Sequence, residues 1–162
     1  MTIRHILVPI DFSAHSTRVV DFARTVAEGV HAEVHLVHIL EEPYRSAGPY
    51  EFRLPDTPAR RDRLYAHARS ELTQFADEMR VKDIRTTLEV RSGNVTEEIV
   101  KAAMDYGADL IVMGTQGRTG IHHLLAGSVA EDVIRRARCP VLAIRAHAGV
   151  VAGAHGGAGA AA

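Results

Sequence analysis

Five short runs of apolar and β-branched residues alternate with four stretches of helical periodicity, and this alternation is the strongest constraint on the fold. The strand-like runs cover residues 3–10, 33–40, 84–91, 109–113 and 140–144. Strands that alternate with helices are typical of a parallel sheet with right-handed crossovers and helices on both faces. The sequence therefore predicts an α/β fold built on a five-stranded parallel sheet.

The strand-like runs differ in their pattern of polarity. The first is continuously apolar from Ile6, as expected of a central strand buried on both faces. The third alternates polar and apolar residues from Ile84 to Arg91, which favours an edge strand with one hydrated face. His35 and His38 lie three residues apart in the second run, so their side chains are predicted to face opposite sides of the sheet and not to chelate one ion together.

The ends of the helices are indicated by residue types that satisfy free backbone groups. Side chains that can accept hydrogen bonds from first-turn N–H groups stand at the start of the helical stretches, at Ser13, Thr57, Asn94 and Ser128. Glycine readily adopts the left-handed conformation that ends many helices, so Gly29 and Gly107 are predicted to end two of them.

Length, charge and aromatic content limit the classes of partner. The 162 residues suffice for one domain, and a net charge of −1 gives no electrostatic reason to expect nucleic acid or an anionic membrane as partner. Aromatic residues make up 5% of the chain and Trp is absent, which disfavours a base-stacking surface. There is no signal-peptide pattern and no apolar stretch of roughly 20 residues, so we expect a cytoplasmic protein.

Composition also predicts the extent of the domain. Residues 146–162 contain only Ala, Gly, Val and His, which bury too little apolar area to offset the entropy of ordering them. We therefore predict a domain at residues 1–145 and a disordered tail at residues 146–162. Cys139 is the only cysteine, so an intramolecular disulfide is excluded, and a small buried hydrophobic role is expected for it.

A glycine-rich loop follows the fourth strand-like run. The run ends at Gly114, Gly117 comes three positions later, and Gly127-Ser128 stand where the next helical pattern begins. Glycine lets backbone N–H groups approach an anion closely, and the first turn of a helix has free N–H groups and a partial positive charge. The loop therefore predicts a site for nucleotide phosphates, with a purely structural tight connection as the alternative.

Two common phosphate motifs are excluded. The chain has no Gly-Lys-Ser/Thr sequence, and no glycine follows the first strand-like run, so neither a Walker A motif nor a dinucleotide fingerprint is present. The carboxyl ends of parallel strands share one edge of a sheet, where ligands of such folds bind. Residues 9–11, 39–40 and 114–117 are predicted to meet at that edge.

The chain resembles the universal stress protein family, and specifically its ATP-binding branch. The resemblance is carried by Met113-Gly114-Thr115-Gln116-Gly117-Arg118, Leu125-Ala126-Gly127-Ser128-Val129 and Cys139-Pro140-Val141-Leu142, together with residues 6–13 and 36–39. It implies a three-layer sandwich with strand order 3-2-1-4-5, similar to the adenine nucleotide alpha-hydrolases. It also implies ATP, ADP or AMP as ligand, Mg²⁺ or Mn²⁺ held with the phosphates, a homodimer formed through the fifth strand, and a regulatory role in stress.

Position by position, the resemblance assigns cofactor-binding roles to part of the predicted edge. Asp11 would contact the ribose or a nucleotide-bound metal ion, and Ile39 would line the adenine pocket. The full set of candidate binding residues is Pro9, Ile10, Asp11, Ile39, Met113, Gly114, Gln116, Gly117, Arg118, Gly127, Ser128 and Val129. Arg118 is either a phosphate contact or a solvated surface charge, and Asp11 has a helix-capping role as its alternative.

Two further functions stay open beside nucleotide binding. One is a slow metal-dependent ATPase or phosphotransferase that uses Asp11, and the other is a nucleotide-free dimeric module that binds another protein. Efficient phosphoryl transfer normally needs cations on the transferred group and an oriented nucleophile. The loop contains no lysine, and Gln116, where many relatives have His, cannot shuttle protons. The sequence thus favours binding over fast turnover, with no catalytic residue assigned.

Overall fold

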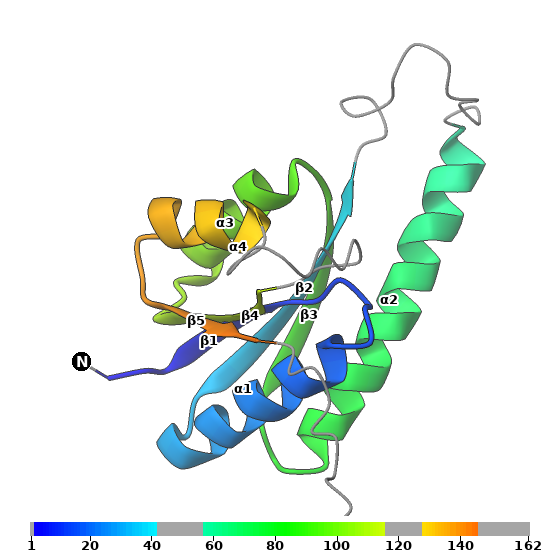
Figure 1. Cartoon of the computed structure of the whole chain (residues 1–162). Coiled ribbons are helices and arrows are strands. Elements are labelled where there is room, and N and C mark those ends of the chain that lie inside the picture. The colour runs from blue at the N-terminus through cyan, green and yellow to red at the C-terminus, as the bar shows by residue number, and fades with distance from the viewer. Residues whose placement is uncertain (1, 42–56, 116–127, 146–162) are drawn as a thin grey trace, which may run out of the picture.

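The computed structural model describes residues 2–41, 57–115 and 128–145, which form one parallel sheet with helices on both faces (Figure 1). The strands lie in the order β3-β2-β1-β4-β5, as the resemblance implies. The elements are β1 (His5–Pro9), α1 (Ser16–Val30), β2 (Glu33–Glu41), α2 (Pro58–Arg80), β3 (Thr86–Gly93), α3 (Val95–Tyr106), β4 (Leu110–Gly114), α4 (Ser128–Arg136) and β5 (Val141–Ile144). The α/β architecture predicted from the alternating pattern is confirmed.

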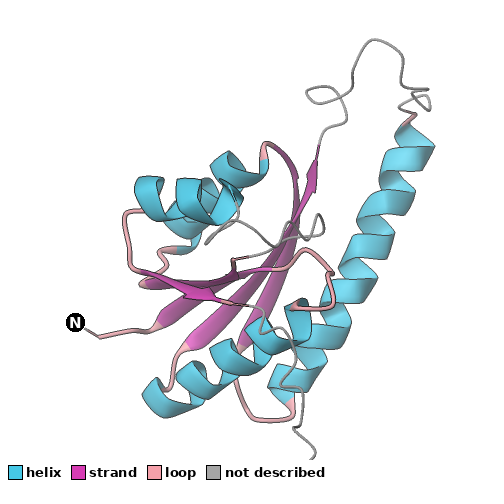
Figure 2. Ribbon diagram, viewed as in Figure 1, coloured by secondary structure: helices cyan, strands magenta, loops and turns pink. Residues whose placement is uncertain are grey.

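The sheet separates two hydrophobic layers. Helices α1 and α2 cover one face, and α3 and α4 cover the other (Figure 2). The fully buried residues of the first core cluster, under α1 and α2, are Ile6, Val8, Ala23, Val34, Leu36, Leu72, Ala76, Met79 and Val112. Those of the second core cluster, under α3 and α4, are Leu7, Val37, Ala102, Ile111 and Val133. Consecutive residues of β1 enter opposite clusters, which is why this strand is apolar without interruption.

Several predicted helix ends are confirmed by hydrogen bonds. The Thr57 hydroxyl accepts the backbone N–H of Arg60 at 3.3 Å, and the side-chain oxygen of Asn94 accepts that of Glu97 at 3.1 Å. Gly107 has a φ of 67° and ends α3. Ser128 is the first residue of α4, and its predicted capping role stays a prediction.

The ends predicted for α1 are wrong. This helix begins at Ser16 and not directly after Ser13, because the Ser13 backbone N–H donates to Asp11 and its carbonyl accepts from Ser16 in a turn that precedes the helix. At the other end, Gly29 stays helical, and His31 takes the left-handed conformation with a φ of 56°.

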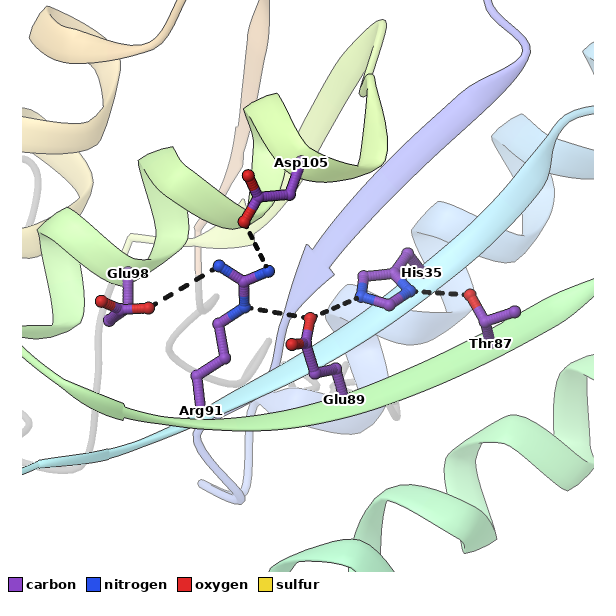
Figure 3. A network of polar contacts seen from close by, with 6 residues as sticks. All are labelled: His35, Thr87, Glu89, Arg91, Glu98 and Asp105. Carbon is purple, nitrogen blue, oxygen red and sulfur yellow. Dashed lines mark hydrogen bonds and ion pairs between the residues drawn. The ribbon is translucent and has the colours of Figure 1, made fainter.

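An ion-pair cluster joins the edge strand β3 to α3 (Figure 3). Arg91 Nε lies 3.0 Å from Glu89 Oε2 on the same strand. Its terminal nitrogens lie 2.9 Å from Asp105 Oδ2 and 3.7 Å from Glu98 Oε2, both on α3. Only 12% of the Arg91 side chain is exposed, so the polar face predicted to be hydrated is largely covered by ion pairing with the helix.

His35 extends this cluster onto β2. Its Nδ1 lies 2.7 Å from Thr87 Oγ1 and its Nε2 lies 3.4 Å from Glu89 Oε2 (Figure 3). The imidazole also stacks on Tyr106 at a centroid distance of 4.5 Å. Burial lowers the pKa of His35 below its ordinary value of 6.5, although Glu89 opposes the shift.

Three further predictions concern Cys139, membrane-spanning helices and the tail at residues 146–162. Cys139 is partly buried against the second core cluster, and burial raises the pKa of its thiol. In the parts of the chain that the structure describes, no helix is long and apolar enough to cross a bilayer. The predicted tail at residues 146–162 lies outside the described residues, so the domain boundary at residue 145 stays a prediction.

Candidate functional site

A cavity of about 250 Å³ opens at the carboxyl-terminal edge of the sheet. It lies where β1, β2 and β4 end and where α1, α3 and α4 begin. The helices that follow β1 and β4 in the chain cover opposite faces of the sheet, α1 on one and α4 on the other. Ligands of doubly wound sheets bind at this topological switch point.

One wall of the cavity is apolar. Ile39 on β2 and Met113 on β4 face the same side as the second core cluster and are 6% and 4% exposed. Val95 and Ile99, one turn apart on α3, and Val129 on α4 complete this wall. Such a wall suits a flat, weakly polar ring system.

The opposite side of the cavity is polar and comes from the turn between β1 and α1. Asp11, Ser13, His15 and Ser16 line it. Asp11 Oδ1 accepts hydrogen bonds from the Ser13 backbone N–H at 3.0 Å and from the Ser16 hydroxyl at 2.9 Å. Asp11 therefore organises the turn before α1, which was the alternative role for this residue, while it also lines the cavity.

The end of β4 is fixed to the edge strand β5. The Thr115 backbone N–H donates to the Ile144 carbonyl at 2.9 Å, and the Thr115 hydroxyl lies 3.4 Å from the same oxygen. Gly114 and Thr115 line the cavity just before the glycine-rich loop leaves the sheet. This anchoring sets where the loop starts relative to the polar turn.

The cavity brings together eight of the twelve candidate binding residues: Pro9, Ile10, Asp11, Ile39, Met113, Gly114, Ser128 and Val129. The other four candidates, Gln116, Gly117, Arg118 and Gly127, lie outside the described residues. The binding roles of all twelve remain predictions.

Some residues that line the cavity were not among the binding residues predicted from the sequence. Val95, Ile99 and His38 line the cavity, as does Glu41 at the end of β2. The apolar spacing of Val95 and Ile99 marked them as a buried helix face but could not show that this face ends at a cavity.

The arrangement of acids fits a metal ion only together with a ligand. Among residues 2–41, 57–115 and 128–145, no group of three or more His, Cys, Asp and Glu side chains is placed to hold a metal ion. Asp11 and Glu41, the two acids that line the cavity among the described residues, supply few ligands for Mg²⁺, which usually binds one or two carboxylates plus phosphates and water. A divalent ion at this edge would therefore need phosphate oxygens.

Comparison with known proteins gives consistent results. A profile of the Universal stress protein family matches residues 2–145. Universal stress protein A homolog 1 of Coxiella burnetii is 34% identical over 144 residues, which are 89% of this chain and 97% of the relative. The structure of protein MJ0577 of Methanocaldococcus jannaschii has a TM-score of 0.76 at 25% identity and covers 91% of this chain and 99% of that chain. A universal stress protein of Archaeoglobus fulgidus in complex with dAMP has a TM-score of 0.61 at 27% identity and covers 88% of this chain and 98% of that chain.

Proposed function

The chain belongs to the universal stress protein family, and from this premise we propose that it binds ATP or another adenine nucleotide in the cavity at the carboxyl edge of its sheet. In this proposal it acts in the cytoplasm as a stress-response regulator that holds the nucleotide and does not turn it over rapidly. The dAMP complex of the Archaeoglobus fulgidus relative supports an adenine nucleotide as the class of ligand.

The observation that carries the proposal is the meeting of an apolar wall and a polar turn in one cavity. The adenine ring would pack against Ile39 and the second core cluster, and the ribose would lie toward Asp11. Ser128 lines the same cavity at the first position of α4, where free N–H groups and the helix dipole favour an anion. The phosphates would extend from Ser128 along the glycine-rich loop, with Gln116, Gly117, Arg118 and Gly127 as predicted contacts.

A divalent ion is proposed only as a companion of the phosphates. Asp11 lies in the polar turn and lines the cavity, so it is the residue that would contact Mg²⁺ or Mn²⁺ beside the phosphates. When bound, such an ion would neutralise phosphate charge. Hydrogen bonds from Ser13 and Ser16 hold Oδ1 of Asp11 in place and thereby restrict the orientation of its carboxylate.

The composition of the site favours binding over rapid phosphoryl transfer. The two lysines of the chain, Lys82 and Lys101, do not line the cavity. Neither can take the place that a Walker lysine occupies on β- and γ-phosphates. We therefore place slow metal-dependent hydrolysis second and a nucleotide-free protein-binding module third.

We propose a homodimer through β5. This strand lies at one edge of the sheet, and each of its four residues is half-buried in the single chain. An exposed strand edge carries unpaired N–H and C=O groups that a second copy can pair with. A dimeric mass in light scattering at micromolar concentration is expected, and a monomeric mass would contradict this assembly.

Mass spectrometry of gently purified protein, followed by titration calorimetry with ATP, ADP, AMP and GTP, tests the ligand. We expect an adenine nucleotide to co-purify and ATP to bind more tightly than GTP. Gly117→Val and Gly127→Val should abolish ATP binding in folded protein, because a bulky Cβ keeps the backbone away from phosphate. Gly29→Val is the matched control, since a Cβ at Gly29 meets open space on α1.

The same preparations separate the alternatives. Phosphate release well above background that needs Mg²⁺ or Mn²⁺ and is lost in Asp11→Ala would favour the enzyme. The absence of both a co-purifying nucleotide and a thermal shift with ATP would favour the nucleotide-free module. Wild-type ATP affinity in Gly117→Val or Gly127→Val would contradict the phosphate assignment.

A further inference from the structure

The backbone next to Asp11 is in an unfavourable conformation. Phe12 has a φ of 59°, in the left-handed region that bulky L-residues rarely adopt. Such a conformation persists only where surrounding contacts determine it, and residues of this kind are concentrated at binding sites and active sites. Phe12 lies between Asp11 and Ser13, so its conformation sets where the Ser13 backbone N–H lies relative to the Asp11 carboxylate that accepts it.

His38 on β2 provides the contacts that hold Phe12. The rings of Phe12 and His38 stack with a centroid distance of 4.2 Å and an interplanar angle of 29°. His38 is 4% exposed, and the partly buried ring of Phe12 packs against the first core cluster, so the fold restrains both rings. The stacking therefore compensates for the unfavourable backbone conformation.

The same histidine holds the residue on the other side of Asp11. His38 Nδ1 lies 2.6 Å from the Ile10 carbonyl oxygen. A carbonyl only accepts hydrogen bonds, so Nδ1 carries the proton and donates it. The Ile10 backbone N–H in turn donates to the Val37 carbonyl at 2.8 Å, so both polar backbone groups of Ile10 are bound by β2.

Asp11 thus lies between two residues that β2 fixes in place. Its Oδ1 is held by Ser13 and Ser16, whereas Oδ2 makes no hydrogen bond to another described residue. Within the described residues, only Oδ1 of this carboxylate is hydrogen-bonded, and the neighbours Ile10 and Phe12 link the position of Asp11 to His38. A ligand that contacts Asp11 would meet an oriented acceptor and would lose less entropy on binding.

We propose that His38 and Phe12 are positioning residues that fix the orientation of Asp11 toward the nucleotide. The proposal rests on the nucleotide-binding function proposed above. His38 acts through the backbone of Ile10 and the ring of Phe12. Replacement of His38 should therefore weaken binding only as far as Asp11 contributes to it.

A double-mutant cycle with the full chain tests this coupling. Titration calorimetry with ATP and Mg²⁺ is carried out for His38→Leu and His38→Asn, each with Asp11 and with Asp11→Ala. His38→Leu removes the donor to Ile10 and should weaken ATP binding about tenfold, while His38→Asn, whose amide N–H can replace Nδ1, should stay within about threefold of the wild type. In the Asp11→Ala background, His38→Leu should cause no further loss.

Two control variants distinguish a loss of ATP affinity through Asp11 from a loss caused only by impaired folding. His35→Leu removes another histidine of β2, at the end away from the cavity, and should leave ATP affinity unchanged. Phe12→Leu keeps an apolar side chain but removes the stacked ring, and should weaken ATP binding several-fold only where Asp11 is present. If His38→Leu does not fold, as judged by its thermal transition, the Phe12→Leu cycle decides the question.

The outcomes separate this proposal from the one on which it rests. Suppose that the wild type binds ATP and that His38→Leu or Phe12→Leu lowers ATP affinity equally with Asp11 and with Asp11→Ala. The positioning role is then wrong and nucleotide binding stands. If the wild type binds no adenine nucleotide, the proposed function fails and the positioning role fails with it. Equal losses in His38→Asn and His38→Leu would also contradict a role for the hydrogen bond to Ile10.

Discussion

Asp109, the residue before β4, accepts the backbone N–H of His5, the first residue of β1, at 3.0 Å. The same carboxylate oxygen accepts the backbone N–H of Arg4 at 2.8 Å. These two bonds lower the pKa of Asp109 below its ordinary value, because they stabilise the ionised form. One side chain therefore ties the starts of two neighbouring parallel strands and helps to fix their register.

Replacement of Asp109 by Asn should lower the stability of the protein at neutral pH. The folded-state pKa lies below the unfolded one, so the stabilisation is fully present above the ordinary value of 3.8 and is lost as pH falls through the window below it. Urea midpoints of wild type and Asp109→Asn should differ at pH 7, and the difference should shrink as pH falls below 3.8. Asp62→Asn, on the exposed part of α2, controls for the loss of one negative charge, and a difference that persists unchanged into acid would contradict this account.

Gly93 ends β3 with a φ of 142°, which L-residues rarely adopt. Gly93→Ala should therefore destabilise the fold by about 1–3 kcal/mol. A Cβ there would lie 3.2 Å from Glu98 Cγ, but that side chain can move, so the backbone conformation dominates the cost. Gly29→Ala is the matched comparison: it lies in α1 with open space around it and should stabilise by about 0.5–1 kcal/mol. Chemical denaturation of both variants checks the opposite signs.

The alternation of strands and helices could be predicted because each element carries its own local signal, whereas the strand order came from the family resemblance. The caps at Thr57 and Asn94 depend on neighbours within four residues, and the apolar run from Ile6 depends on burial alone. The start of α1 could not be predicted in this way. Ser13 has a side chain suited to a cap, but its backbone N–H donates to Asp11 in a turn, and the helix begins only at Ser16.

The site could be predicted only where a general rule applies. Strand ends converge in any parallel sheet, so Asp11, Ile39 and Gly114 could be placed on one edge from the sequence alone. The contributions of Val95 and His38 depend on how α3 and the turn after β1 pack over that edge. Such packing joins residues 28 or more positions apart and leaves no periodic signal in the sequence.

His35 should make the stability of the fold depend on pH near neutrality. Its folded-state pKa lies below 6.5 because of burial, so the unfolded chain binds more protons in the window just below 6.5. The contribution of His35 is present above that value and is lost as pH falls through the window. The urea midpoint should therefore decrease more between pH 8 and pH 5.5 in the wild type than in His35→Asn. An identical decrease in both proteins would show that His35 does not contribute.

Ser128→Ala should distinguish the phosphate end of the proposed site from its adenine end. Ser128 lines the cavity at the first position of α4, where its hydroxyl can donate to a phosphate oxygen. A hydrogen bond to a charged group contributes about 1.5–3 kcal/mol, so ATP should bind roughly tenfold to a hundredfold more weakly. Adenosine has no phosphate and should bind the variant as it binds the wild type. Ser70→Ala, on the exposed side of α2, is the matched control, and equal losses of ATP and adenosine affinity would place Ser128 outside the phosphate site.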